Sequence, residues 1–239
     1  MIPFPHSPTH LAIGVFDGVH LGHQALLKAL AAKGSGTVLT FSTHPRSFPL
    51  LCTLEHRIRL IESFGHNVVP VTFESIKGIT AEEFLDQLIA QGLEQFILGY
   101  DNHIGKGRAG TPSFIKQYLE QRNVEVIEVP PILEEGEAIS SGRIRKLIES
   151  GDLAKATTML GRPYSLFFPT HNFSLEGLVT PPSGTYAALL KTTSSVHKGT
   201  ANIRVPQKGA ATSLLEVDLF DLDRLPSPPY EVILSTLLR

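Results

Sequence analysis

The sequence has little of what marks several broad classes of protein. Its one cysteine, Cys52, excludes an internal disulfide and a thiolate metal cluster, and it makes a reducing cytoplasm the expected compartment. It lacks an apolar run of the roughly 18 residues that a membrane helix needs, so no membrane partner is expected. Its start contains three prolines in the first ten residues and no basic segment, which is unlike a signal peptide.

Neither sign of charge prevails in the composition. Lysine and arginine number 21 and aspartate and glutamate 23, so the sequence does not predict a general attraction to nucleic acid. With 239 residues, 42% of them hydrophobic and 18% charged, the chain is long enough for one or two domains with well-buried cores. The same composition excludes a disordered chain and a coiled coil.

Strand-like and helix-like segments alternate through the first 160 residues. The strand candidates are 10–16, 37–42, 67–73, 95–100 and 124–129, and the helix candidates are 22–33, 54–64, 80–91, 112–122, 141–149 and 153–160. Such alternation is typical of a mostly parallel sheet with crossover helices on both faces. The pattern therefore predicts a Rossmann-like α/β domain over residues 1–160.

The pattern changes at Gly161. Eight of the seventeen prolines lie in the remaining residues, and no helical period is sustained there. Short strand candidates at 185–191, 200–205, 214–220 and 230–234 are separated by proline-rich turns. Residues 161–239 are therefore predicted to form a small antiparallel, β-barrel-like domain.

The segment with the most candidate functional residues lies between the first strand and the first helix. It reads Ile-Gly-Val-Phe-Asp-Gly-Val-His-Leu-Gly-His over residues 13–23. Open α/β sheets bind ligands at this edge, glycines let a phosphate approach the backbone, and a helix start offers free N–H groups. The alternative is a plain strand–turn–helix corner with two surface histidines. The candidate binding residues are Gly14, Phe16, Asp17, Gly18 and Gly22, with His20 and His23 as donors to phosphate oxygens.

The segment from Phe16 to His23 resembles the phosphate motif of the prokaryotic FAD synthetases, the bifunctional riboflavin kinase/FMN adenylyltransferases. These belong to a wider nucleotidyltransferase group with a His-x-Gly-His signature. Further blocks that resemble the family follow in its order, at 40–45 (Thr-Phe-Ser-Thr-His-Pro), 99–110 (Gly-Tyr-Asp-Asn-His-Ile-Gly-Lys-Gly-Arg-Ala-Gly), 139–145 (Ile-Ser-Ser-Gly-Arg-Ile-Arg) and 151–164. The resemblance covers about residues 10–164, and it assigns residues 1–160 to the nucleotidyltransferase domain.

The resemblance implies transfer of AMP from MgATP to the phosphate of FMN, which gives FAD and pyrophosphate. Catalysis would consist of positioning and charge neutralisation, without a covalent enzyme intermediate. His20 and His23 would donate near the reacting phosphorus, and Arg143 would bind the leaving pyrophosphate. Mg²⁺ would arrive with ATP, since no cluster of side chains looks like a permanent metal site. The other residues implied at the pyrophosphate are Ser140, Ser141 and Arg145.

Several of these assignments have a structural alternative. Asp17 could orient a histidine or Mg²⁺, or stabilise the Asp-Gly turn. Asp101 could contact the nucleotide or metal, or serve as a turn or cap residue. His44 could contact the flavin phosphate, or be a turn histidine before Pro45. Arg145 could equally lie on a solvated helix face. Arg108, in the third block, is assigned to nucleotide or flavin binding.

The sequence departs from the family in three places. Gly142 stands where the fourth block usually has threonine, which removes a hydroxyl and weakens a helix start. Asn102 and Ile104 flank His103 where the third block usually has aromatic residues, which alters how the flavin or adenine ring is packed. Thr43 replaces a proline, which is a milder change.

The β-domain resembles a reduced riboflavin kinase module. Phe-Pro-Thr-His-Asn at 168–172 is similar to the family's Pro-Thr-Ala-Asn motif, which implies that Thr170 and Asn172 bind Mg²⁺ and phosphate. Glu216 falls where the kinase has its general base. Only three residues separate Tyr164 from Phe168, where the family has a longer, glycine-bearing segment. Kinase activity on riboflavin, a second candidate substrate, therefore stays open.

Two other functions compete with the FMN adenylyltransferase hypothesis. One is nucleotidyl transfer to another phosphate-bearing acceptor within the His-x-Gly-His group, which the altered third block keeps open. The other is a flavin- or nucleotide-binding protein without catalytic activity, which Gly142 and the shortened β-domain favour and the intact His20, His23 and Arg143 oppose. The sequence does not indicate an oligomeric state.

Overall fold

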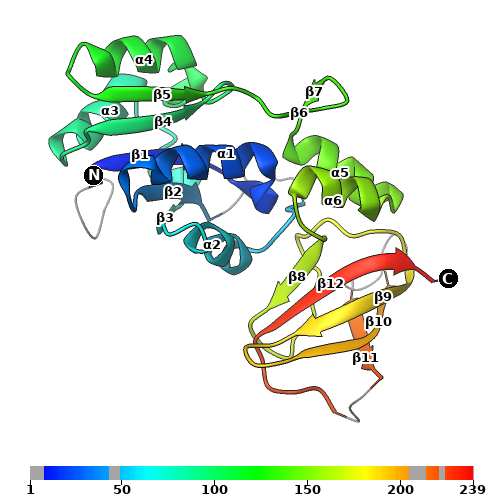
Figure 1. The fold of residues 1–239 in the computed structure, drawn as a ribbon. Coiled ribbons are helices and arrows are strands. Elements are labelled where there is room, and N and C mark those ends of the chain that lie inside the picture. Colours follow the sequence, from blue (N-terminus) through cyan, green and yellow to red (C-terminus); the bar gives the residue numbers. More distant parts are fainter. Residues whose placement is uncertain (1–7, 43–48, 205–213, 221–223, 239) are drawn as a thin grey trace. The chain divides into compact units, whose positions relative to one another are not determined.

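The computed structural model describes residues 8–42, 49–204, 214–220 and 224–238 of the protein (Figure 1). The chain divides into two compact units. The first comprises Met1–Ser47 and Ile58–Ala138, and the second comprises Phe48–Arg57 and Ile139–Arg239. The second unit is thus discontinuous in sequence, because a short stretch near residue 50 belongs with the C-terminal part of the chain. The sequence predicts that two functional domains meet at residue 160, and this boundary stays a prediction.

The first unit contains a parallel sheet of five strands. They are β1 (His10–Gly14), β2 (Thr37–Phe41), β3 (Asn67–Val71), β4 (Gln95–Gly99) and β5 (Glu125–Val129). The strand order is β3-β2-β1-β4-β5, so the chain runs outward from β1 to β3 and then returns to build the other half from β4. This confirms the predicted Rossmann-like fold. The direction of winding reverses between β1 and β4.

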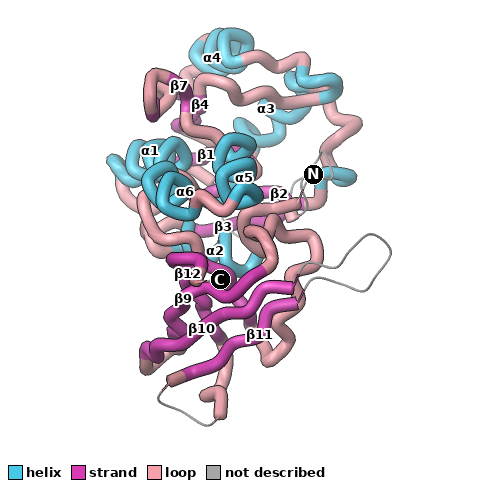
Figure 2. The backbone as a smooth tube through the Cα atoms, turned by 90° about the vertical axis from the view of Figure 1, so that its right-hand side faces the viewer, coloured by secondary structure: helices cyan, strands magenta, loops and turns pink. Residues whose placement is uncertain are grey.

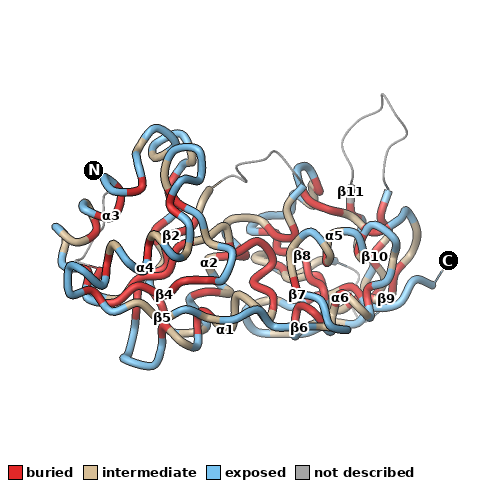
Figure 3. Tube along the Cα trace, turned by 90° about the horizontal axis from the view of Figure 1, so that it is seen from above, coloured by how far each residue is buried: buried red, intermediate tan, exposed pale blue. Residues whose placement is uncertain are grey.

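Helices cover both faces of this sheet, and successive buried residues of β1 point to opposite faces. Leu11 and Ile13 of β1 pack in one apolar core with α3 (Ala81–Ala90) and α4 (Pro112–Glu120). The intervening Ala12 lies in a second core with α1 (Leu21–Leu30) and with Ile61 of α2 (Leu54–Glu62). β4 is buried along its whole length, as the red trace in Figure 3 shows. Such continuous burial is expected of a central strand in a sheet covered on both faces.

Local signals in the sequence account for the starts of two of these helices. Thr80 and Glu83 form a capping box, in which each side chain accepts from the other residue's backbone N–H, at 3.1 and 2.9 Å. Thr111 caps α4, and Pro112 is its first residue. Short 3₁₀ segments also occur in the connections: η1 (Asp17–Val19), η2 (Ala31–Lys33), η3 (Phe73–Ser75) and η4 (Lys106–Arg108).

The second unit joins two helices to an antiparallel sheet. The helices are α5 (Ser141–Ser150) and α6 (Leu153–Leu160), and the strands are β8 (Ser165–Phe168), β9 (Gly184–Lys191), β10 (Val196–Arg204), β11 (Leu214–Leu219) and β12 (Tyr230–Leu237). The strand order is β11-β10-β9-β12-β8, and the sheet curls into half a barrel, whose β9–β12 strands are magenta in Figure 2. This confirms the predicted antiparallel, barrel-like fold.

Two features of the fold were not predicted. β8 is a strand of four buried residues between two prolines, and it pairs with β12. The hairpin of β6 (Leu133–Glu134) and β7 (Glu137–Ala138) turns at Glu135 and Gly136, both with positive φ. In the part of the chain that the structure describes, no helix is both long and apolar enough to span a membrane.

Candidate active site

The candidate site of the first unit lies at the carboxyl ends of β1 and β4. The ladder between these strands ends at the pair Ala12 and Ile97, whereas the ladder between β1 and β2 continues to Gly14 and Thr40. β1 and β4 therefore part at the point where the winding of the sheet reverses. Open α/β sheets bind ligands in the crevice that such a reversal creates.

The backbone after β1 follows a strained path. Phe16 and Val19 have φ values of +52° and +40°, and Gly18 between them has φ +76°. The left-handed region is uncommon for an aromatic residue and unfavourable for a β-branched one, and such strain costs about 1–3 kcal/mol per residue. Phe16, Asp17 and Val19 are each only 1% exposed, so the surrounding core holds this conformation. A Cβ at Gly14 would lie 3.2 Å from the Phe16 ring, which is tighter than an ordinary contact.

This path brings the two predicted histidines together at the start of α1. His20 is the N-cap, and its Nδ1 accepts from the backbone N–H of His23 at 3.4 Å. The two rings stack with centroids 3.7 Å apart and planes 19° apart, and the Phe16 ring lies 5.1 Å from that of His23. Gly22 lies between them in the first turn of the helix. A helix N-terminus beside two imidazole rings provides donors suited to an anionic group.

The segment after β4 contacts the end of β1. The Asn102 amide Nδ2 donates to the Ile13 carbonyl oxygen at 2.8 Å, next to the loop that carries the histidines. Asp101 and Tyr100 are exposed, and partial burial together with the charge of Asp101 raises the pKa of the Tyr100 hydroxyl. Asp101 is thus exposed two residues beyond the end of β4, a position that fits both the nucleotide-binding role and the turn role.

Arg108 reaches this segment through His103. Its Nη2 lies 3.0 Å from His103 Nδ1, which is also 2.8 Å from the Asp101 carbonyl oxygen. One ring nitrogen cannot donate to the carbonyl and accept from the guanidinium at the same time, so only one of the two contacts is a hydrogen bond in a given tautomer. Arg108 has φ +60° and follows Gly107 at φ +65°.

The second unit holds the predicted pyrophosphate residues at the start of α5. Ser140 is the N-cap and its Oγ accepts from Arg143 N at 3.3 Å, while Ser141 and Arg143 are partly buried in the first turn. The Arg145 Nε donates to the Pro49 carbonyl oxygen at 2.7 Å. Arg145 thus contacts the backbone of its own unit.

The residues compared with a kinase site also lie in the second unit. Thr170 and Asn172 are exposed, and their side-chain oxygens accept from Asn172 N and Ser174 N at 3.2 Å each. Glu216 is exposed on β11 and forms an ion pair of 2.9 Å with Arg204. The Phe173 carbonyl accepts from Leu215 N at 3.2 Å, so the loop that carries Asn172 meets the strand that carries Glu216.

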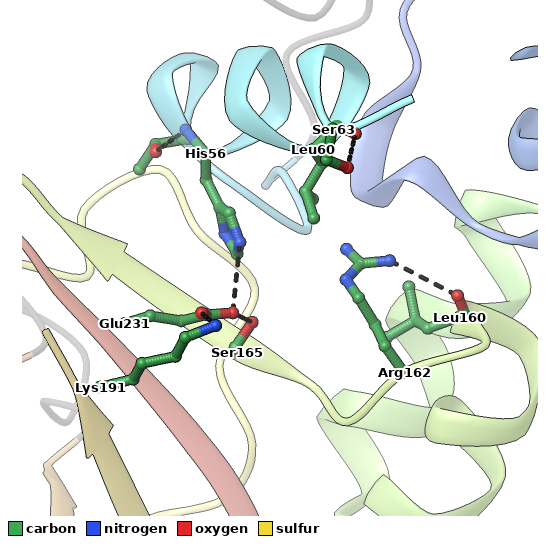
Figure 4. Close-up of polar contacts among 9 residues, drawn as sticks. His56, Leu60, Ser63, Leu160, Arg162, Ser165, Lys191 and Glu231 are labelled. Carbon is green, nitrogen blue, oxygen red and sulfur yellow. Dashed lines mark hydrogen bonds and ion pairs between the residues drawn. The ribbon is translucent and has the colours of Figure 1, made fainter. Parts of the chain in front are cut away.

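A second polar cluster in this unit surrounds Glu231 of β12 (Figure 4). Its Oε1 accepts from Ser165 Oγ at 2.8 Å and lies 3.8 Å from His56 Nε2, and its Oε2 lies 3.6 Å from Lys191 Nζ. Burial lowers the pKa of the neighbouring Arg162, while Cys52 and Glu231 act in the opposite direction. These residues join β8, β9 and β12 to the stretch near residue 50.

The structure thus brings the predicted residues into separate groups. The first unit gathers those of the loop after β1 with those of the segment after β4, and the second gathers the α5 residues and, elsewhere, the kinase-like ones. His44 lies outside the described residues. Sequence reasoning missed the contacts of Asn102 and Thr40, whose Oγ1 donates to the Val15 carbonyl at 3.0 Å. The signal for both was a polar residue at or just beyond the carboxyl end of a buried strand.

A doubly wound parallel sheet, with a histidine pair and a helix N-terminus at its reversal point, defines a nucleotide-binding α/β protein. The sequence profile of the FAD synthetase family matches residues 3–143. The chain belongs to the FAD synthetase family.

Individual relatives agree with the family profile. The bifunctional riboflavin kinase/FMN adenylyltransferase of Bacillus subtilis strain 168 is 30% identical over 90% of this chain and 78% of its own length. The FAD synthetase of Listeria monocytogenes is 32% identical over 74% of this chain and 79% of its own length. A crystal structure described as a macrolide-efflux protein from Streptococcus pneumoniae superposes with a TM-score of 0.80, covering 100% of this chain and 88% of that one. At 23% identity, this likeness concerns the fold alone.

Proposed function

We propose that the protein is an FMN adenylyltransferase, which transfers AMP from ATP to FMN and produces FAD and pyrophosphate. The observation that carries the proposal is the stacked pair His20 and His23 at the N-terminus of α1, in a chain of the FAD synthetase family. In this proposal residues 1–160 form the transferase domain and residues 161–239 a reduced kinase-like domain.

The proposed reaction is a direct displacement at phosphorus. A phosphate oxygen of FMN forms a bond to the α-phosphorus of ATP, the bond from that phosphorus to the bridging oxygen breaks, and pyrophosphate leaves with the electron pair. His20 and His23 donate hydrogen bonds to phosphate oxygens near the reacting centre. Arg143 neutralises charge on the leaving group, assisted by the first turn of α5. The other proposed binding residues are Gly14, Phe16, Asp17, Gly18, Gly22, His44, Asp101, Arg108, Ser140, Ser141 and Arg145.

The proposal includes a divalent cation that arrives with ATP, and Mg²⁺ is the expected ion because it prefers phosphate and carboxylate oxygens. No group of three or more His, Cys, Asp or Glu residues that could hold a metal occurs among the described residues. This donor set fits an ion held mainly by the nucleotide, with the exposed carboxylate of Asp101 as the proposed protein ligand. The reaction needs ATP, which supports the cytoplasm as the proposed compartment.

Riboflavin phosphorylation is a second candidate function of the same chain. The backbone hydrogen bond between Leu215 and Phe173 favours it, because it places Thr170 and Asn172 beside the strand of Glu216. Glu216 would take a proton from the ribityl hydroxyl as this oxygen attacks the γ-phosphorus of ATP, and the bond from that phosphorus to the bridging oxygen would break so that ADP leaves. Its ion pair with Arg204 must open first.

Product analysis separates these functions. Purified protein is incubated with MgATP and either FMN or riboflavin, and the flavins are resolved by chromatography. We expect FAD from FMN, and FMN or FAD from riboflavin shows that the β-domain is an active kinase. If FMN yields no FAD, the proposed function is wrong, and other phosphate-bearing acceptors are then compared by pyrophosphate release.

A histidine variant distinguishes an enzyme from a protein that only binds flavin. His23→Ala should lower the turnover of FAD synthesis by at least about 100-fold, because it removes a donor at the developing charge. The matched control is His197→Ala on β10, which should keep wild-type turnover. A binding protein without catalytic activity would show no turnover in the wild type and nearly the same FMN affinity in all three proteins.

A further inference from the structure

On each side of β1, a side chain makes a contact just beyond the point where the strand pairing stops. The β1–β4 ladder stops at Ala12 and Ile97, and beyond it Asn102 Nδ2 donates to the Ile13 carbonyl at 2.8 Å. On the other side the ladder stops at Gly14 and Thr40, and Thr40 Oγ1 donates to the Val15 carbonyl at 3.0 Å. The two side chains therefore fix the two carbonyl groups that flank Gly14.

The Asn102 amide is itself closely fitted against the backbone of β4. A Cβ on Gly99 would lie 2.9 Å from Asn102 Oδ1, a separation at which one group has to move. Gly99, the last residue of β4, thus leaves the space in which the amide turns toward β1. Gly99 and Asn102 thus form one device, which joins β4 to β1 at the point where the two strands separate.

What this device holds is the strained segment that leads to the histidines. The strained segment begins at Phe16 (φ +52°), two residues after Gly14. It ends at Val19 (φ +40°), which directly precedes His20. Strained backbone persists only where its surroundings over-determine it. A displacement of about 1 Å at positioning groups can lower a rate by up to about 100-fold. A shift of the Ile13 carbonyl would therefore change the positions of the His20 and His23 side chains.

We propose that Asn102 is a positioning residue for adenylyl transfer, whose amide holds the end of β1 and so sets the position of the His20 and His23 pair. The inference rests on the proposed function. It also gives a physical role to a residue that stands where the family usually has an aromatic one. Asn102 is expected to affect turnover more than substrate binding, because it acts through the histidines.

Three variants test the device, with FAD synthesis as one readout. Asn102→Ala removes the donor, and Gly99→Ala displaces the amide without altering it. Each should lower kcat on the order of 10-fold, with KM for ATP and for FMN changed less than about threefold. The double variant should be no worse than Asn102→Ala, because neighbours that act through one contact are not additive. Gly78→Ala, where a Cβ meets nothing within 4 Å, is the control and should match the wild type.

Hydrogen exchange followed by mass spectrometry provides a readout that does not depend on activity. Peptides covering residues 13–20 should exchange on the order of 10-fold faster in Asn102→Ala and Gly99→Ala, while peptides over β2 and β3 keep wild-type rates. Wild-type kcat together with wild-type exchange in both variants would overturn the inference. If the wild type itself makes no FAD, the proposed function fails, and the exchange rates still decide whether Asn102 holds the loop. If Asn102→Ala does not fold, Gly99→Ala decides alone.

Discussion

At Gly142, in the first turn of α5, there is space for a side chain. A Cβ there would meet only Ser140 Oγ, at 3.9 Å, which is ordinary contact, and the backbone does not require a glycine. Gly142→Ala should therefore raise the free energy of unfolding by about 0.5–1 kcal/mol, since glycine is a poor helix residue. Denaturant unfolding of the two proteins measures this difference.

The same position tests the role of α5 in binding the leaving group. Gly142→Thr restores the hydroxyl that the family usually has, and a further hydrogen bond to phosphate is worth about 1 kcal/mol. We expect KM for ATP to fall about fivefold relative to Gly142→Ala, which shares the helix effect but lacks the hydroxyl. Equal KM values in the two variants would argue against phosphate at this turn.

Glu125 at the start of β5 provides a prediction about pH. Hydrogen bonds from Lys33 and from Gln95 lower the pKa of its carboxyl group. A lowered pKa means that the ionised form stabilises the folded state above the unfolded pKa of about 4.3, and that this contribution is lost as the pH falls through the folded pKa. Glu125→Gln should thus lower Tm slightly at pH 7 and leave Tm unchanged at pH 3, as thermal scans at both values would show.

At the scale of elements, Glu231 connects three strands of the half-barrel. Glu231→Ala would leave the Ser165 hydroxyl, on a residue only 4% exposed, without its acceptor, so the free energy of unfolding should fall by about 1–3 kcal/mol. Glu231→Gln keeps an acceptor for Ser165 and loses only the charge toward His56 and Lys191. This control should cost less than about 1 kcal/mol. Urea titrations of both variants test whether the hydrogen bond outweighs the ion pairs.

The elements with strong local signals were the ones that the sequence predicted. The alternation of apolar strands with amphipathic helices identified the sheet of the first unit and its crossovers. β8 was missed because its four residues are too few to show a period, and their strand form depends on pairing with β12, far along the chain. The β6–β7 hairpin depends on a turn at Glu135 and Gly136 that is weak as a sequence signal.

The same distinction between local and long-range signals applies to the candidate site. His20 and His23 were predicted because their glycine-rich motif is local. Asn102 was noted only as a departure from the family, because its partner, the Ile13 carbonyl, is 89 residues away in sequence. Side-chain contacts to a distant backbone group leave no periodic trace, so only the folded arrangement of β1 and β4 reveals them.

At the scale of the whole molecule, the metal requirement should belong to the reaction and not to the fold. EDTA should abolish FAD synthesis, and added Mg²⁺ should restore it, because the cation arrives with ATP. Tm should stay unchanged by EDTA, since an ion that arrives with the nucleotide is not part of the folded chain. A fall in Tm with EDTA would instead indicate a metal bound by the protein itself.

The discontinuity of the second unit affects how the protein is made. The stretch near residue 50 leaves the ribosome long before residues 139–239, and at ordinary rates of translation the interval is on the order of ten seconds. During that time His56, later buried beside Glu231, has no C-terminal partner. α2 begins in one unit and ends in the other, so its first turn must wait while its last turns can already pack. Because residues 48–57 and 139–239 belong to one unit, a single cut in the gene cannot yield the second unit whole.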